Sequence, residues 1–142
     1  NAVKSLKLEN NIIFRGNTPE PEKAYNQADV VVFSSITEGF PFSVIEAMSC
    51  GKAIVASDVG GVREALDGCG VLVKSRRPSE LAHAIVGLLE NKKLTHGFGM
   101  AAMKRANDYF TLEQCVLKYR LLYEELVSTR RSERAQVKEV LA

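Results

Sequence analysis

The stretch from Ser34 to Gly51 restricts the possible folds of this chain more than any other. It follows an apolar run, Val30 to Phe33, and contains a turn with Gly39 and Pro41. Proline suits the start of a helix because its missing N–H is not needed there. Glycine suits the left-handed position just past a helix end, where Gly51 stands. The stretch therefore predicts a buried strand, a loop and a short helix over residues 42–49.

The start of this predicted helix has the properties of an anion site. Its free backbone N–H groups, from about Phe42 to Ile45, point back toward the end of the strand. A helix N-terminus carries roughly half a positive charge and binds phosphate readily. At the carboxyl end of a parallel strand, it faces the crevice where open α/β sheets bind ligands. We therefore expect phosphate groups to bind here.

Two carboxylates stand on either side of the helix start. Glu38 is in the loop, and Glu46 is about one turn into the helix, on the same face as Ser43. The opposite, apolar face carries Val44, Ala47 and Met48. A carboxylate only accepts hydrogen bonds, so Glu46 suits ribose hydroxyls and Glu38 suits a second set of hydroxyls. The pattern favours a site for a molecule made of sugar, phosphates and nucleoside.

The spacing of the two acids also has an ordinary explanation. A glutamate in a first helical turn is favoured by the helix dipole without any ligand. A glutamate in a loop is usually only solvated. Spacing alone leaves both interpretations open.

Composition excludes several classes of protein. The 142 residues suffice for one domain with a core, and 46% hydrophobic with 25% charged residues is typical of soluble globular proteins. The net charge of +2, from 19 basic and 17 acidic residues, is too small to indicate nucleic acid or a polybasic membrane anchor. No apolar run approaches the roughly 20 residues of a membrane span, and no signal peptide is evident.

The cysteines and histidines do not form a ligand pattern. The three cysteines are widely spaced, which predicts buried or semi-buried thiols in a reducing compartment and a cytoplasmic location. They are Cys50, Cys69 and Cys115. His83 and His96 have no partner at ligand spacing, so we expect ordinary helix-surface residues.

The remaining elements alternate in type along the chain, which predicts a parallel, doubly wound α/β sheet. Buried strands are expected at 11–16, 29–34, 52–57 and 70–73, with helices at 78–90 and 92–109. Residues 1–10 resemble the tail of a helix. Thr18 is expected to cap a short helix that begins at Pro19 and ends near Ala28. Thr111 and Gln114 form a capping-box pattern before the last helix. Residues 1–127 are interpreted as the folded domain and 128–142 as a charged helical tail.

The segment from Glu38 to Glu46 resembles the E-x7-E signature of retaining GT-B glycosyltransferases, family 4 and its relatives. The likeness extends from about Asn10 to Leu126, through the strand, glycine turn and helix of Ala53 to Glu64. It implies a Rossmann-like fold, specifically the carboxyl-terminal, donor-binding half of such an enzyme.

The resemblance also implies roles for individual residues. Glu38 would be catalytic, binding hydroxyls of the donor sugar, and Glu46 would bind the ribose hydroxyls. The diphosphate and sugar would lie against Gly39, Phe40, Phe42, Ser43 and Val44. Arg15, Gly16 and Asn17 would lie beside the base. No metal and no further cofactor is expected.

One part of the resembling proteins has no counterpart in this sequence. Their donor-binding domain begins with a strand-helix-strand unit whose Arg and Lys neutralise the donor diphosphate. In the strand order 3-2-1-4-5-6, strands 11–16 and 29–34 would be separated by the absent pair, which would leave backbone groups unpaired. We therefore predict a fragment, truncated on its N-terminal side, of a protein of roughly 350 to 450 residues.

The resemblance thus implies a retaining transferase of hexosyl groups from a nucleotide-diphosphate sugar, with a role in bacterial-type polysaccharide biosynthesis. The fragment alone is expected to be inactive. A UDP-sugar is the expected donor and a GDP-sugar, such as GDP-mannose, the second choice. The missing N-terminal domain would bind a sugar or lipid-linked acceptor, at a membrane surface in the latter case. A non-catalytic nucleotide-sugar-binding module and a sugar-nucleotide epimerase of the same architecture remain alternatives, and fold resemblance does not fix the substrate.

Overall fold

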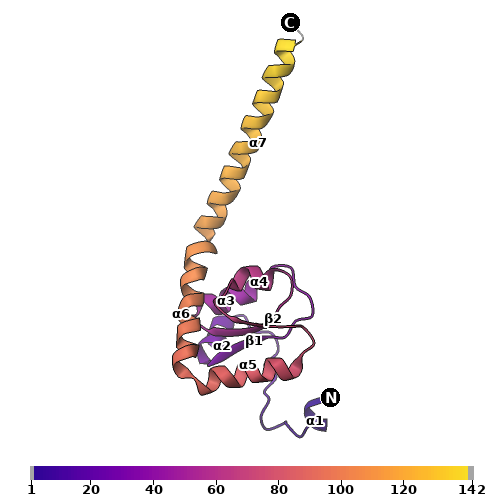
Figure 1. Cartoon of the computed structure of the whole chain (residues 1–142), viewed down its shortest axis with the longest axis vertical. Helices are drawn as coiled ribbons and strands as arrows, with labels where there is room; N and C mark the ends of the chain where they lie inside the picture. The colour runs from indigo at the N-terminus through magenta and orange to yellow at the C-terminus, as the bar shows by residue number, and fades with distance from the viewer. Residues whose placement is uncertain (1, 141–142) are drawn as a thin grey trace.

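The computed structural model describes residues 2–140, and the side chains of residues 2–130. Within this part, three parallel strands form one sheet in the order β1-β2-β3 (Figure 1). They are β1 (Val30–Phe33), β2 (Ala53–Ser57) and β3 (Val71–Val73). Val31 lies beside Ile54, and Ala56 beside Leu72. The central strand β2 is buried along its whole length, which explains its continuously apolar sequence.

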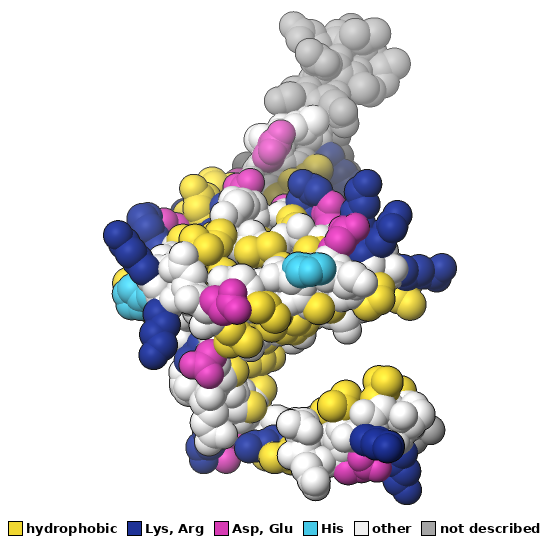
Figure 2. All heavy atoms as spheres, turned by 60° about the horizontal axis from the view of Figure 1, so that its bottom comes forward, with side chains coloured by type: hydrophobic (Ala, Val, Ile, Leu, Met, Phe, Trp, Pro, Cys, Tyr) yellow, Lys and Arg dark blue, Asp and Glu magenta, His cyan; other side chains and the backbone are white. Residues whose placement is uncertain are grey.

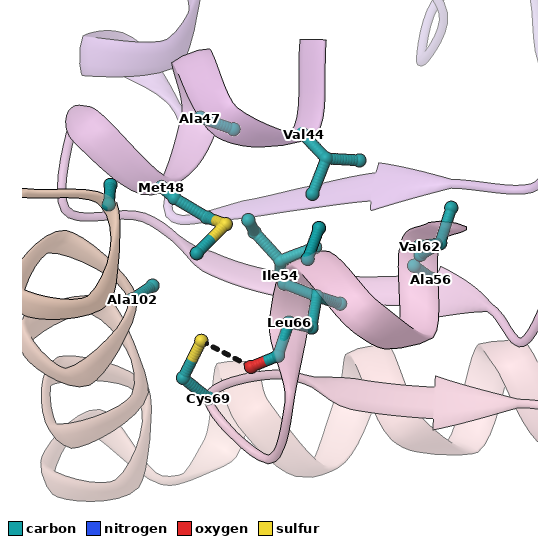
Figure 3. Close-up of a cluster of buried hydrophobic side chains, with 11 residues drawn as sticks. Val44, Ala47, Met48, Ile54, Ala56, Val62, Leu66, Cys69 and Ala102 are labelled. Carbon is teal, nitrogen blue, oxygen red and sulfur yellow. Dashed lines mark hydrogen bonds between the residues drawn. The ribbon is translucent and has the colours of Figure 1, made fainter. Parts of the chain in front are cut away.

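Helices cover both faces of this sheet. They are α1 (Ala2–Ser5), α2 (Pro21–Gln27), α3 (Phe42–Ser49), α4 (Gly61–Leu66), α5 (Pro78–Glu90), α6 (Lys92–Tyr109) and α7 (Leu112–Val140). The larger core cluster joins one face of β2 to α3, α4 and α6, with Val44, Met48, Ile54, Val62, Leu66 and Ala102 fully buried or nearly so (Figure 3). The second cluster joins the other face of β2, through Ala53 and Val55, to Leu88 of α5.

The helices and the three strands follow the sequence predictions closely. Helices α3, α5 and α6 begin and end at the predicted residues, and each strand is within one residue of its prediction. The Thr111 hydroxyl accepts a hydrogen bond from the Gln114 N–H at 3.2 Å, which confirms the predicted helix start there. The backbone at Gly51 has φ +66°, as expected just past a helix end.

The predicted strand at Asn11–Gly16 is wrong. The segment is irregular and solvent-exposed, with Ile13 80% and Phe14 76% accessible. Hydrophobic side chains lie exposed along the N-terminal part, which stands apart from the compact part in Figure 2. A strand forms by pairing its backbone groups with a neighbour, and within the described residues this segment pairs with none. The apolar sequence alone is therefore not enough to make it a strand.

The helix predicted from Pro19 begins two residues later, at Pro21. A residue that precedes proline is disfavoured in the helical region, and Glu20 precedes Pro21. Glu20 accordingly lies outside the helical region, with φ −127° and ψ 67°, and is the N-cap residue. The Thr18 hydroxyl instead accepts a hydrogen bond from the Glu20 N–H at 3.3 Å, inside the preceding turn. The first helix is also shorter than predicted, ending at Ser5.

Helix α7 extends well beyond the compact part of the molecule (Figure 1). Its apolar stripe is exposed, since Leu112, Val116, Tyr119, Leu122, Tyr123 and Leu126 are each roughly half accessible or more. The helix continues without a break through residue 128, where the sequence suggested the start of a tail. Residues 141–142 of that tail lie outside the described residues.

The three cysteines are free thiols in different surroundings. Cys69 is buried and donates to the Leu66 carbonyl at 2.6 Å, and burial raises the pKa of its thiol. Cys50 is half-buried. Cys115 is exposed, which corrects the prediction of a buried or semi-buried thiol, because this stretch of α7 is open to solvent, as its exposed neighbours Leu112 and Val116 show.

Arg105 links α6 to the C-terminal end of α4. Its guanidinium donates to the carbonyls of Ala65 and Glu64 at 2.8 and 2.9 Å. It also forms an ion pair with Asp67 at 3.1 Å. These carbonyls lie at the C-terminus of α4, where a cation is favoured by the helix dipole. No local sequence pattern indicates this contact, because its partners are some forty residues apart.

Candidate functional site

Glu38 lies in the loop that follows the carboxyl end of β1. The Ser35 hydroxyl donates to its carboxylate at 2.7 Å, and the side chain is half-buried. A hydroxyl three residues earlier thus orients this carboxylate. One carboxylate oxygen remains to accept hydrogen bonds from a ligand.

Two consecutive glycines form a seat for this loop. The Gly61 N–H donates to the Gly39 carbonyl at 2.5 Å. A Cβ atom at Gly60 would overlap the Glu38 carbonyl oxygen, and one at Gly61 would overlap that of Gly39. Gly60 also has φ +43°, which side-chain-bearing residues rarely adopt. The sequence showed Gly60 and Gly61 only as a turn, yet they let the Glu38 loop pack backbone against backbone on the start of α4.

Phe40 holds the other end of the loop. Its ring packs edge-on against Phe110, with centroids 5.6 Å apart and an interplanar angle of 65°. The Arg105 guanidinium lies 5.6 Å from the Phe110 ring. Phe40 is still 40% accessible, so it has surface left for a ligand. The loop is therefore attached to the fold at Glu38, Gly39 and Phe40.

Helix α3 presents Glu46 to solvent while its opposite face is buried. Val44, Ala47 and Met48 are fully buried, as the sequence pattern predicted. The Tyr25 hydroxyl, from α2, donates to the Glu46 carboxylate at 3.4 Å. This long hydrogen bond restrains the side chain weakly. Tyr25 is a neighbour that the sequence analysis did not identify, because it lies 21 residues away in the chain.

The start of α3 is free of side-chain caps, with Pro41 as its N-cap residue. The Val44 N–H donates to the Pro41 carbonyl at 3.2 Å. The expected run of free N–H groups is therefore shorter than predicted, because the first turn closes on itself. The N–H groups of Phe42 and Ser43 make no hydrogen bond within the described residues. These two donors are what the helix start offers to an anion.

The other predicted residues divide into two groups. Phe42 is 78% accessible and Ser43 half-buried, next to the helix start. The Val44 side chain lies in the core, so only its backbone could face a ligand. Arg15, Gly16 and Asn17 lie in the exposed irregular segment. In the described part of the chain, no hydrogen bond or ion pair joins these three to Glu38 or Glu46.

The Tyr25–Glu46 contact makes a prediction about ionisation. The Tyr25 pKa is raised above its ordinary value of 10.0. Burial is the largest cause, and the negative charge of Glu46 is the next. The neutral phenol thus favours the folded state below about pH 10, and this contribution is lost as the pH rises through the higher folded pKa. The phenolate absorbance of the protein minus that of Tyr25→Phe should show a midpoint above pH 10.

Substitution of the acid tests the second cause. Glu46→Gln should move that midpoint back toward 10.0 without reaching it, because burial remains. Glu22→Gln, on the same helix as Tyr25, is the control and should leave the midpoint unchanged. A midpoint equal in the protein and in Glu46→Gln would show that the two groups do not interact.

The described residues contain neither a metal-binding cluster nor a membrane-spanning helix. No group of three or more His, Cys, Asp or Glu residues there is arranged to hold a metal ion. Among the helices of that part, none combines the length and apolar character needed to cross a membrane.

The fold and the strand-end site define a class of protein. A parallel sheet with this arrangement of helices matches the C-terminal domain of GT-B glycosyltransferases. Sucrose-phosphate synthase from Thermosynechococcus elongatus superposes with a TM-score of 0.82 at 30% identity, over 90% of this chain and 33% of that one. HepE of Anabaena, in complex with UDP, gives 0.79 at 29% identity, over 89% and 35%.

The chain belongs to the family described as Glycosyl transferases group 1, which matches residues 1–91. It is 35% identical over 127 residues to an uncharacterized glycosyltransferase of Methanocaldococcus jannaschii, covering 85% of this chain and 32% of that protein. The chain thus spans about a third of the length of these relatives. The expected α/β fold is confirmed.

Proposed function

We propose that this chain is the donor-binding part of a retaining glycosyltransferase of family 4 type. It would transfer a hexosyl group from a nucleotide-diphosphate sugar, in the cytoplasm and without a metal ion. The observation that carries the proposal is the loop seated on Gly60 and Gly61. It holds Glu38 at the end of β1, directly before the uncapped start of α3, and Glu46 follows one turn later.

The proposed chemistry follows from where charge develops. When the nucleoside diphosphate leaves, negative charge grows on its phosphates while the sugar becomes oxocarbenium-like. The dominant catalytic contribution is then stabilisation of the leaving phosphates. The Phe42 and Ser43 N–H groups would supply part of it, and basic residues outside this chain the remainder. Glu38 would bind the sugar hydroxyls and Glu46 the ribose.

Solved relatives support a UDP-sugar as the donor. HepE has been determined with UDP and with UDP-glucose, and it is 29% identical to this chain. A GDP-sugar is the second candidate. Residues 1–127 would form the binding domain, with Arg15 to Asn17 beside the base once neighbouring strands order that segment. The acceptor, a sugar or a lipid-linked molecule, would bind on another domain.

The test is donor binding by Glu46 variants. UDP-glucose titrated into the chain, followed by amide chemical shifts, should perturb residues 38–46 in a saturable manner. Glu46→Gln should weaken binding at least about tenfold, because hydrogen bonds to a charged group contribute about 1.5–3 kcal/mol. Glu90→Gln, an exposed glutamate at the far end of α5, is the matched control and should bind normally.

Several outcomes are informative. Equal affinity of Glu46→Gln and the control would remove Glu46 from the site. Perturbations outside the Glu38 loop and α3 would overturn the proposed location. In the longer protein of which we propose this chain is a part, binding without transfer would favour a non-catalytic module. Transfer with retention of the anomeric configuration, seen by NMR, would support the retaining mechanism.

A further inference from the structure

A cavity opens at the carboxyl ends of all three strands, on the α5 side of the sheet. Its volume is about 260 Å³. It is lined by Ser34, Ile36, Ser57, Val73, Lys74, Arg76, Arg77, Pro78 and Leu81. Ser34 follows β1, Ser57 ends β2 and Val73 ends β3. The cavity is therefore formed by the ends of the three β-strands and the start of α5.

The cavity is strongly basic. Lys74, Arg76 and Arg77 line it, and no acidic residue does so among the described residues. Two acids close by in the sequence are paired with arginines, and one of these arginines, Arg77, itself lines the cavity. Asp58 is held by Arg63 in a two-point ion pair, and Glu80 lies at the outer limit of an ion pair with Arg77, at 4.0 Å. Exposed pairs of this kind are weak. Figure 2 shows Lys and Arg side chains projecting around the rim of the compact part.

The start of α5 adds further donors to this cavity. Arg77 is its N-cap residue and makes no side-chain cap, and Pro78 occupies the first turn. The N–H groups of Ser79 and Glu80 therefore have no capping partner in the described part. The positive end of the helix dipole lies at the same place. Both features favour an anion beside Arg77 and Pro78.

The loop that leads into α5 holds an unused hydroxyl. The Ser75 hydroxyl oxygen is buried and has no hydrogen-bond partner among the described residues. Buried polar groups are nearly always paired. Its neighbour Arg76 has φ +62°, an uncommon conformation for a residue with a side chain. The loop thus contains a buried hydroxyl without a hydrogen-bond partner in the described part and an arginine with an uncommon backbone conformation, and of these two residues Arg76 lines the cavity.

This cavity is separate from the Glu38 and Glu46 site. Ser57 continues the alternation of Ala53 and Val55, which face α5, whereas Ile54 and Ala56 face α3 and α4. Glu46 belongs to α3, on the opposite face of the sheet. The two sites share the loop after β1, because Ser34 and Ile36 line the cavity while Ser35, between them, donates to Glu38.

We propose that this cavity is a second anion site, which binds a phosphate group carried by a molecule other than the nucleotide sugar. Guanidinium groups match phosphate oxygens in two-point hydrogen bonds, and the lysine adds a point charge. The Ser34 and Ser57 hydroxyls supply neutral donors. At 260 Å³, the cavity is below the usual 300–1,000 Å³ of pockets for whole small molecules, so it fits a phosphate group better than a complete nucleotide sugar.

The test uses inorganic phosphate as the probe. Amide chemical shifts of the chain should move in a saturable manner around residues 74–81, with a dissociation constant of about 10 mM or tighter. The double variant Arg76→Gln, Arg77→Gln should bind at least tenfold more weakly. Both side chains are exposed, so the fold should persist. The matched control is Lys118→Gln, Arg120→Gln, which removes two exposed cations from α7 and should bind normally.

Further measurements distinguish failure of this proposal from failure of the proposed function. Phosphate binding should survive Glu46→Gln and saturating UDP-glucose, and its loss under either condition would overturn a second site. An equal loss in the control variant would show nonspecific charge attraction and would also overturn it. Co-sedimentation with phosphatidylcholine vesicles that contain phosphatidic acid distinguishes the source. Binding that depends on Arg76 and Arg77 assigns the phosphate to a lipid headgroup, and binding of free phosphate alone assigns it to a soluble ester.

Discussion

Gly60→Ala is expected to lower the free energy of unfolding by about 2–6 kcal/mol. A Cβ atom there would overlap the Glu38 carbonyl oxygen, and the backbone has φ +43°. Strain of that kind costs of order 1–3 kcal/mol, and forcing atoms into a packed contact costs about as much again. The neighbour is backbone and cannot rotate aside, so the Glu38 loop must move. Urea unfolding of the chain, followed by circular dichroism, measures the loss.

Gly68→Ala is the matched control for this substitution. Gly68 also has a positive φ, +84°, but a Cβ atom there would meet nothing within 4 Å. It should therefore show only the backbone strain. The difference between the two variants isolates the close approach of the loop to α4. Equal losses in both variants would contradict a seat formed by Gly60.

Gly60→Ala should also affect ligand binding at the proposed donor site. If Gly60 holds Glu38 in place, Gly60→Ala should weaken UDP-glucose binding even at low temperature, where the chain is still folded. Gly68→Ala should bind normally. A donor affinity unchanged in folded Gly60→Ala would separate the glycine seat from binding.

Local patterns explain why much of the fold could be predicted. Pro41 and Gly51 bracket α3, and both act through their own backbone conformation. The prediction of a strand at 11–16 failed because a strand needs a neighbouring strand to pair with. The sequence of the segment does not show whether such a neighbour is present. Cys115 failed for a related reason, since a periodic apolar stripe does not say what covers it. The type of each helix or strand could therefore be predicted from its local sequence, whereas the burial of its side chains could not.

The same distinction between local and distant residues applies to the candidate site. Glu38 and Glu46 were identified because they flank one turn in a recognisable segment. The groups that hold them, Tyr25 and Gly60, are distant in the chain and ordinary by themselves. Lys74, Arg76 and Arg77 were not singled out either, because a short basic run usually lies in solvent. Only the topology brings it to the strand ends.

Leu66→Ala is the second substitution with a large expected effect. Leu66 is fully buried where α4 meets β2, in the cluster with Ile54 and Ala56 (Figure 3). Removing such a side chain leaves a cavity and typically costs 2–5 kcal/mol. Small domains are stable by only about 5–15 kcal/mol in total. The urea midpoint should therefore fall by a large fraction of its value, with little change in the slope of the transition.

Leu126→Ala makes the same chemical change on α7 and is the control. Leu126 is 54% accessible, so its loss should cost no more than about 0.5 kcal/mol. If Leu126→Ala were as costly as Leu66→Ala, the apolar stripe of α7 would be buried in solution, for example against a second copy, and the cost would depend on protein concentration. A small, concentration-independent effect would instead confirm that the core formed by α3, α4 and β2 carries the stability that holds the Glu38 loop.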